Sequence, residues 1–158
     1  MDNPLYDYRA NLLARLESIV GEMGDAMAAI PESQWHTVLL SDRSPHLILS
    51  SLCAVERLAY LPRLRRLIAE DSPTLKNFDP DRWQAEQYDP AVPMTTLLAE
   101  YAGLRESELQ LLRPLPPEGW ARVGRHPTFG RHTVQWWAER ILEHSMIHLR
   151  ELRGINNE

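Results

Sequence analysis

The sequence is poor in two residue types, with a single cysteine, Cys53, and a single lysine, Lys76, among 158 residues. One thiol excludes an intramolecular disulfide framework and a zinc site built from several cysteines. No apolar run approaches the roughly 18 residues of a membrane-spanning helix. A Gly-rich phosphate loop and the Gly-x-Ser-x-Gly nucleophile motif are also missing. These absences argue against a membrane protein, a disulfide-stapled secreted domain, a P-loop nucleotide-binding protein and an α/β-hydrolase.

The charge balance argues against one more class of protein. The net charge is −5, with 17 basic and 22 acidic residues. Proteins that bind nucleic acid usually carry a basic face, so no nucleic-acid partner is expected. The first residues, Met1 to Pro4, are acidic and lack the apolar segment of a signal peptide. We therefore expect a cytoplasmic protein, with residues 1–158 forming one domain of ordinary globular composition.

Apolar residues recur every three or four positions in four long stretches. These predict helices over about residues 5–30, 45–70, 93–112 and 133–153. Ser44 suits an N-cap and Pro45 the first helical position, whereas Pro62 should kink or interrupt the second helix. No stretch shows sustained alternation of period two. The predicted fold class is all-α, a four-helix bundle with long Pro-rich connections and at least one crossover.

Two connections between the predicted helices are long. Residues 73–93 contain four prolines and are expected to form a crossover or a functional cover, with a short helical turn after Pro80. Residues 120–132 are predicted to be a loop. We expect its histidines, His126 and His132, to cap a local turn or to face solvent.

The residues most indicative of chemistry lie in the last predicted helix. His144 and His148 are four residues apart, so their side chains lie on one face, about one turn apart. Two imidazoles at this spacing can bind one divalent ion. Two core histidines that only form hydrogen bonds are the alternative. Glu151, three residues after His148, is either a partner that orients its ring or an ordinary solvent-facing carboxylate.

Three motifs, taken in order, resemble the DinB-like (DNA-damage-inducible) four-helix family over about residues 5–155. The second predicted helix begins Ser-Pro-His-Leu-Ile-Leu-Ser-Ser-Leu and continues to Glu56. The segment Gly-Arg-His-Pro-Thr-Phe-Gly-Arg-His-Thr, residues 124–133, is similar to the family's short loop before the last helix. The closing motif His144-x-x-x-His148-Leu-x-Glu151 is similar to the family's final histidine pair.

The resemblance implies a site for a divalent metal, often nickel or zinc, held by three histidines. His144 and His148 match the two ligands of the last helix. Ser51 occupies the third position, so the histidine triad is incomplete. Glu56, five residues further on, matches the family's glutamate. His46 lies about 140° around the helix from Ser51 and does not replace it. Glu56 and Glu151 are the candidates for side chains that orient the ligands.

The resemblance implies two alternative functions. In the first, the chain is a metal-dependent enzyme of the thiol-transferase, isomerase or hydrolase type. The metal would then activate a low-molecular-weight thiol or water against a small-molecule substrate. In the second, the chain has lost the metal and serves as a non-catalytic structural or interaction bundle. A homodimer is expected in either case, with Trp136, Met146 and Ile147 as a possible contact face.

The remaining candidates are expected to be structural. Cys53 should be a small buried residue, and at least three of the five tryptophans should pack in the core. The basic cluster Arg63, Arg65 and Arg66 is expected to be a solvated face that pairs with Glu70 and Asp71.

Overall fold

Caps and prolines set the starts of the long helices in the computed structural model, which describes residues 3–38 and 42–156. The Oδ1 atom of Asn3 accepts hydrogen bonds from two backbone N–H groups at the start of α1 (Pro4–Ala28). Ser44 caps α2 (Pro45–Val55) in the same way. The third and fourth long helices are α5 (Met94–Leu112) and α7 (Val134–Asn156). These helices, with α2 continued by the segment that follows it, lie within a few residues of the predicted ranges. Residues 1–2, 39–41 and 157–158 of the predicted 1–158 domain lie outside the described residues.

The second predicted helix forms in three continuous pieces because of Pro62. After α2, the turn η2 (Glu56–Tyr60) is π-helical, and α3 (Leu61–Ala69) follows directly. Proline lacks an N–H and its ring presses on the preceding turn, so an ordinary α-helical ladder cannot run through it. The wider π turn accommodates this defect.

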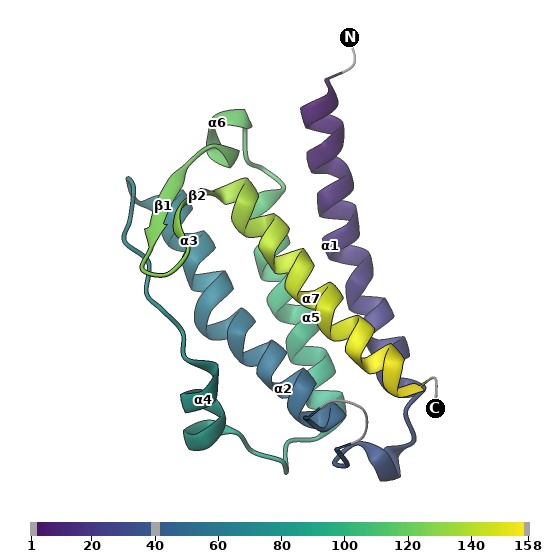
Figure 1. Ribbon diagram of the computed structural model, residues 1–158. Coiled ribbons are helices and arrows are strands. Elements are labelled where there is room, and N and C mark those ends of the chain that lie inside the picture. Colours follow the sequence, from purple (N-terminus) through teal and green to yellow (C-terminus); the bar gives the residue numbers. More distant parts are fainter. Residues whose placement is uncertain (1–2, 39–41, 157–158) are drawn as a thin grey trace.

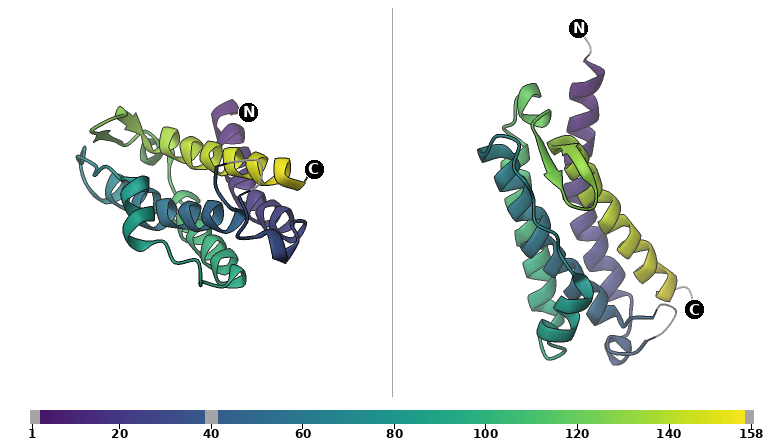
Figure 2. Two further views of the ribbon diagram at one scale, coloured as in Figure 1. Left: turned by 60° about the horizontal axis from the view of Figure 1, so that its bottom comes forward. Right: turned by 60° about the vertical axis from the view of Figure 1, so that its left-hand side comes forward.

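The four helical segments pack as two parallel pairs. In Figure 1, α1 and α7 run one way, and the α2–α3 segment and α5 run the other. Each of α1 and the α2–α3 segment packs against both α5 and α7. Because α3 ends at the opposite end of the bundle from the start of α5, residues 70–93 must return along its side, as Figure 2 shows. This is the predicted crossover.

Short elements cover the sides and ends of the bundle. They are η1 (Glu32–Gln34), α4 (Pro80–Gln87), α6 (Pro117–Trp120) and the antiparallel pair β1 (Val123–His126) and β2 (Gly130–Thr133). The helical turn after Pro80 is confirmed as α4. The prediction of a plain loop over residues 120–132 is wrong, because most of it forms this hairpin. Each strand is only four residues long, too short for an alternating pattern to show in the sequence.

Hydrogen bonds fix the returning connection against the bundle. At one end, the backbone of residues 73–75 pairs with Arg125 of β1, with N···O distances of 2.9 and 2.7 Å. At the other end, the buried ring of His46 lies 2.7 Å from the Tyr88 hydroxyl through Nδ1 and 2.7 Å from the Val92 carbonyl through Nε2. His46 therefore anchors the connection and points away from Ser51, as the helical geometry predicts.

The core consists of two large apolar clusters with a buried polar layer between them, and a third, smaller cluster contains Leu47, Ala54 and Trp83. Arg105 and Glu108 on α5 are both 1% exposed, and Glu56 on η2 is fully buried. The Arg105 guanidinium lies 2.8 Å from Glu56 Oε1 and 3.0 Å from Glu108 Oε1, and it also donates to Ser145 on α7 and to the Leu16 carbonyl on α1. Burial next to Glu56 raises the pKa of Glu108 well above its ordinary value.

Several structural expectations are confirmed. Cys53 is buried, which raises the pKa of its thiol, and Trp83, Trp120 and Trp137 are core residues. In the described residues, no helix is both long and apolar enough to cross a membrane. Ile147 is 48% exposed, and the homodimer stays a prediction.

The buried carboxyl of Glu108 predicts a pH-dependent stability. As the pH rises above the ordinary value of 4.5, the unfolded glutamate loses its proton while the folded one keeps it, so stability falls. Glu108→Gln cannot ionise in either state. We expect the stability advantage of this variant over the wild type to grow as the pH rises above about 4.5, measured by urea unfolding. Parallel pH profiles for the two proteins would contradict the assignment.

Gly124 in β1 has no room for a side chain. A Cβ atom there would lie 2.6 Å from Leu67 Cδ2 and 3.1 Å from the Pro73 carbonyl oxygen. Gly124→Ala is therefore expected to destabilise the protein by about 1–3 kcal/mol through overpacking. Gly103→Ala is the matched control, since a Cβ on this helical glycine meets nothing within 4 Å. The control should gain about 0.5–1 kcal/mol in its free energy of unfolding. Thermal unfolding of both variants measures the two changes.

Candidate functional site

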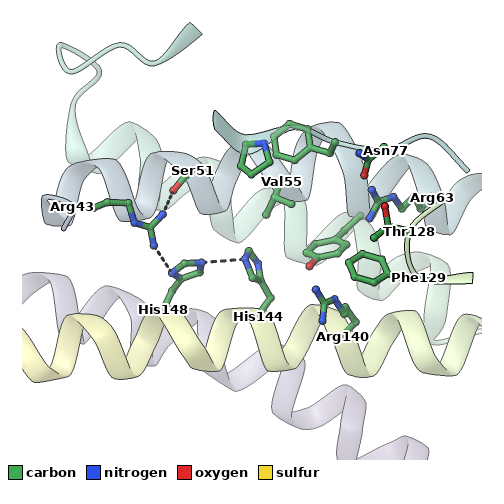
Figure 3. A pocket seen from close by; sticks show the side chains of 13 residues that line it. Arg43, Ser51, Val55, Arg63, Asn77, Thr128, Phe129, Arg140, His144 and His148 are labelled. Carbon is green, nitrogen blue, oxygen red and sulfur yellow. Dashed lines mark hydrogen bonds between the residues drawn. The ribbon is translucent and has the colours of Figure 1, made fainter. Parts of the chain in front are cut away.

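A pocket opens between the α2–α3 segment and α7, beside the returning connection and the hairpin. Its volume is about 340 Å³, at the small end of the range for small-molecule sites. Thirteen of the described residues line it, and Figure 3 draws the side chains of all of them and labels most. Both predicted ligands, His144 and His148, lie on its α7 side, and Ser51 lies on its α2 side. The structure thus brings together the three positions that the resemblance assigns.

The two histidines point toward each other. Their Nε2 atoms are 3.1 Å apart, and their ring planes are nearly perpendicular. Two nitrogens bound at 2.0–2.1 Å to one tetrahedral ion lie about 3.3–3.4 Å apart, so this spacing is close to that of a shared metal. It also matches a direct hydrogen bond in which one ring donates and the other accepts. The Nδ1 atom of His144 has no hydrogen-bond partner within the described part of the chain.

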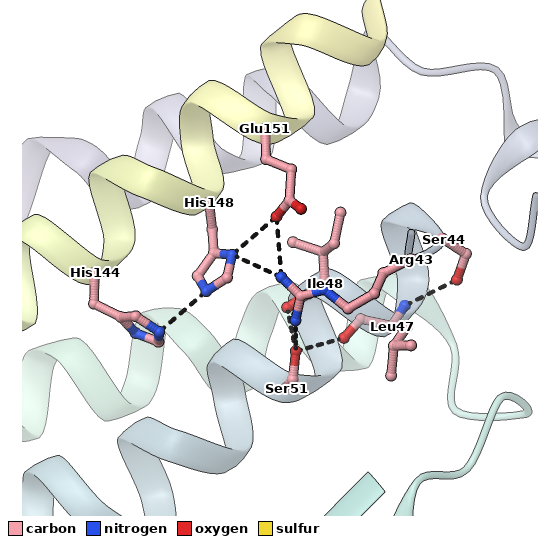
Figure 4. Close-up of polar contacts among 8 residues, drawn as sticks. All are labelled: Arg43, Ser44, Leu47, Ile48, Ser51, His144, His148 and Glu151. Atoms are coloured by element: carbon pink, nitrogen blue, oxygen red, sulfur yellow. Dashed lines mark hydrogen bonds and ion pairs between the residues drawn. The ribbon is translucent and has the colours of Figure 1, made fainter. Parts of the chain in front are cut away.

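Arg43 joins the third position to the histidine pair, as Figure 4 shows. Its Nη1 donates to Ser51 Oγ at 3.1 Å, and its Nη2 lies 3.1 Å from Glu151 Oε1 and 3.4 Å from His148 Nδ1. Ser51 Oγ lies within reach of two backbone carbonyls, Leu47 at 2.8 Å and Ile48 at 3.1 Å. Its hydroxyl proton is therefore used inside the helix.

Glu151 contacts the site. Its Oε1 lies 3.1 Å from His148 Nδ1, the arrangement that orients an imidazole whose other nitrogen faces a ligand. The solvent-facing alternative does not describe this carboxylate. Glu56 lies elsewhere, since its Oε1 bonds Arg105 in the buried layer rather than either histidine. Glu56 thus shapes the site only indirectly, through Ser145, the residue next to His144.

The electrostatic environment of the pair is strongly cationic. Burial, and to a smaller extent the charges of His148, Arg140 and Arg43, together lower the pKa of His144 to about 3. Such a low pKa keeps this imidazole neutral at any physiological pH, as a metal ligand or a hydrogen-bonding residue requires. The same cations, however, disfavour an added divalent ion.

The side chains present do not fit a resident divalent metal. In residues 3–38 and 42–156, no group of three or more His, Cys, Asp or Glu side chains is placed to hold one. A neutral serine hydroxyl is a poor ligand, and that of Ser51 already bonds Arg43 and a carbonyl. The Arg43 guanidinium brings a positive charge to the place where a third histidine would complete the site. Two imidazoles alone hold a metal weakly.

Sequence reasoning missed the other end of the pocket. Arg63 is 7% exposed and lies over the ring of Trp137, with 4.9 Å between its Cζ and the ring centroid. The prediction of a solvated face holds for Arg66, which pairs with Glu70, but is wrong for Arg63. Arg140 also lines the pocket, over the ring of Phe129 at 4.5 Å. Its spacing gave a signal, because Arg140 precedes His144 by the same four residues that separate His144 from His148.

The loop histidines do not join the pair. His126 is buried, not exposed, and its Nδ1 caps the hairpin turn by accepting from the N–H groups of Thr128 and Phe129. His132 stacks on Trp136 with 3.6 Å between ring centroids. The hairpin that they stabilise places Thr128 and Phe129 in the wall of the pocket.

Comparison with known proteins agrees with this fold. The family model of the DinB superfamily matches residues 45–152, and this chain belongs to that superfamily. The match runs from the start of α2 to the last turns of α7, so it includes Ser51 and both histidines.

Two individual proteins are similar to this chain. A protein of Oceanobacillus iheyensis, named as a candidate metal-dependent hydrolase, is 36% identical over 76 residues, which are 48% of this chain and 43% of that protein. The chain thus matches less than half the length of this relative. The structure of YfiT from Bacillus subtilis, described as a probable metal-dependent hydrolase with an unusual four-helix bundle topology, superposes with a TM-score of 0.80. That match covers 96% of this chain and 88% of YfiT at 18% identity, which shows the shared fold.

Proposed function

We propose that this chain is a DinB-superfamily protein that binds a small molecule in its histidine pocket without a resident divalent metal. One observation carries the proposal: Arg43 lies between Ser51 and His148, where a third metal ligand would be required. Its guanidinium supplies the positive charge of the site from within the chain and holds Glu151 as its counter-ion. The proposal is a form of the metal-free alternative, in which the bundle binds a ligand in its pocket.

The enzymatic alternative has its own support. The Nε2 atoms of His144 and His148 converge at 3.1 Å, and the two similar proteins carry names that refer to metal-dependent hydrolysis. A hydrolase, or a thiol transferase as the resemblance implies, would need nickel or zinc on this pair to activate water or a thiol. It is the second candidate, because Ser51 and Arg43 leave such an ion with only two protein ligands.

Metal content separates the two candidates. Tag-free protein is dialysed against zinc or nickel, then against buffer, and its metal content is measured by elemental mass spectrometry. We expect the wild type to retain far less than one equivalent, since two imidazoles beside a guanidinium bind a divalent ion weakly. Retention of about one equivalent that disappears in His144→Ala would refute the proposal and favour the hydrolase or transferase.

A designed variant provides the positive control. Ser51→His together with Arg43→Ala replaces the serine by the missing ligand and removes the competing charge. This double variant is expected to retain about one equivalent of zinc, and adding His144→Ala should abolish the retention. Circular dichroism of each variant checks that the bundle stays folded. The comparison shows whether residues 43 and 51 are what excludes the metal.

A further inference from the structure

Two arginines at the hairpin end of the pocket form no ion pair with an acidic side chain among residues 3–38 and 42–156. Arg63 on α3 and Arg140 on α7 point into the pocket from opposite sides, with Phe129 close by (Figure 3). Among the described residues that line the pocket, none is Asp or Glu. Arg63 donates to the Lys76 carbonyl at 3.1 Å, and Arg140 interacts with the Tyr60 hydroxyl. Both contacts are to neutral oxygens, so they leave the charges uncompensated.

The two guanidiniums also keep unused hydrogen-bond donors. The Nε atoms of Arg63 and Arg140 are buried and have no hydrogen-bond partner within residues 3–38 and 42–156. Burial lowers the pKa of Arg63 and that of His126, and neighbouring positive charge adds to both shifts: Arg140 acts on Arg63, and both arginines act on His126. Holding two mutually repelling cations together, Arg63 buried and Arg140 half-buried, is unfavourable unless an anion joins them. The buried guanidinium of Arg105, by contrast, is flanked by two carboxyl groups.

Aromatic and apolar side chains form the pocket walls next to the two arginines. The stacking of Arg63 on Trp137 and of Arg140 on Phe129 holds the guanidiniums in place before any ligand arrives. Val55 and Phe78 supply apolar lining, and Figure 3 shows Val55 between the arginine end and the histidine pair. A ligand that fits this surface carries its charge at one end and an apolar body behind it.

We propose that Arg63 and Arg140 form a clamp for the oxyanion of a small organic acid, a carboxylate or phosphate joined to an apolar group. The proposal rests on the proposed function in taking the ligand to be a small molecule, and it deepens it by naming the ligand's chemistry. Guanidinium groups suit this role because their planar donor pairs match carboxylate and phosphate oxygens. The apolar body lies along Val55 and Phe78, toward His144.

Calorimetric titration with matched probes tests the clamp. The metal-free protein is titrated with benzoate, phenyl phosphate and the neutral benzamide, at low and at high salt. We expect both anions to bind, benzamide to bind at least about tenfold more weakly, and salt to weaken only the anions. Equal binding of benzoate and benzamide, or no binding of either anion, would overturn the proposal. A difference between the two anions identifies which oxyanion the clamp prefers.

Variants assign the binding to the two arginines. Arg63→Met and Arg140→Met are each expected to weaken anion binding about ten- to hundredfold, because each removes charge-assisted hydrogen bonds. Arg63→Lys and Arg140→Lys keep the charge but lose the planar donor pair, so their affinity for the anion should lie between those of the wild type and the Met variants. The Lys variants also replace any Met variant that does not fold. Arg153→Met makes the same charge change on α7, where Arg153 pairs with Glu22, and should bind as the wild type. Unchanged binding in the Arg63 and Arg140 variants would refute the clamp.

Metal content measured on the same samples keeps the two proposals apart. Metal-free protein that binds neither anion contradicts the clamp and leaves the metal-independent site standing. Protein that retains metal on His144 contradicts the proposed function, while the response of anion binding to the arginine variants still decides the clamp.

Discussion

The guanidinium of Arg105 on α5 contacts the other three helical segments of the bundle. From α5 it reaches the Leu16 carbonyl on α1, Glu56 on η2 and Ser145 on α7. A buried charge is tolerated only when its partners meet it at the right positions, so this cluster fixes how far each helix slides along its neighbours. Removing the guanidinium would leave Glu56 buried without a counter-charge, at a cost of about 3–5 kcal/mol. Because Ser145 is adjacent to His144, the same constraint sets the position of the histidine pair.

Charge is balanced in this layer and unbalanced in the pocket. The raised pKa of Glu108 lets one carboxylate and one guanidinium compensate each other in the core. At the pocket, Glu151 compensates Arg43, but Arg63 and Arg140 face each other without an acidic residue in the lining. An excess of buried positive charge is unfavourable for folding, and natural proteins retain such features mainly where a ligand uses them. The pocket therefore differs chemically from a site built to hold a divalent cation.

Membership of the DinB superfamily settles the fold and leaves the chemistry to the individual side chains. The helical scaffold still presents two histidines at one turn's spacing and a carboxylate behind one of them. The third position has a hydroxyl that is hydrogen-bonded within its own helix, together with an arginine from the segment before α2. The helices around this position pack through their apolar clusters and through the buried layer of Arg105.

Local sequence patterns predict the four helices, the Ser44 cap, the crossover and the shared face of His144 and His148. These follow from local rules, since apolar spacing, prolines and capping residues act within a few positions of one another. The short hairpin over residues 123–133 was not predictable in this way, because its strands are stabilised by pairing with each other and by the contact with residues 73–75. The partners of the charged side chains, by contrast, depend on how the helices pack together. Arg43 and Ser51 are eight residues apart, whereas Arg43 and Glu151 are separated by 108. A local sequence pattern cannot predict a contact between residues so far apart in the chain. The same holds for Arg63 and Arg140, which chain folding brings together from two helices to line one pocket.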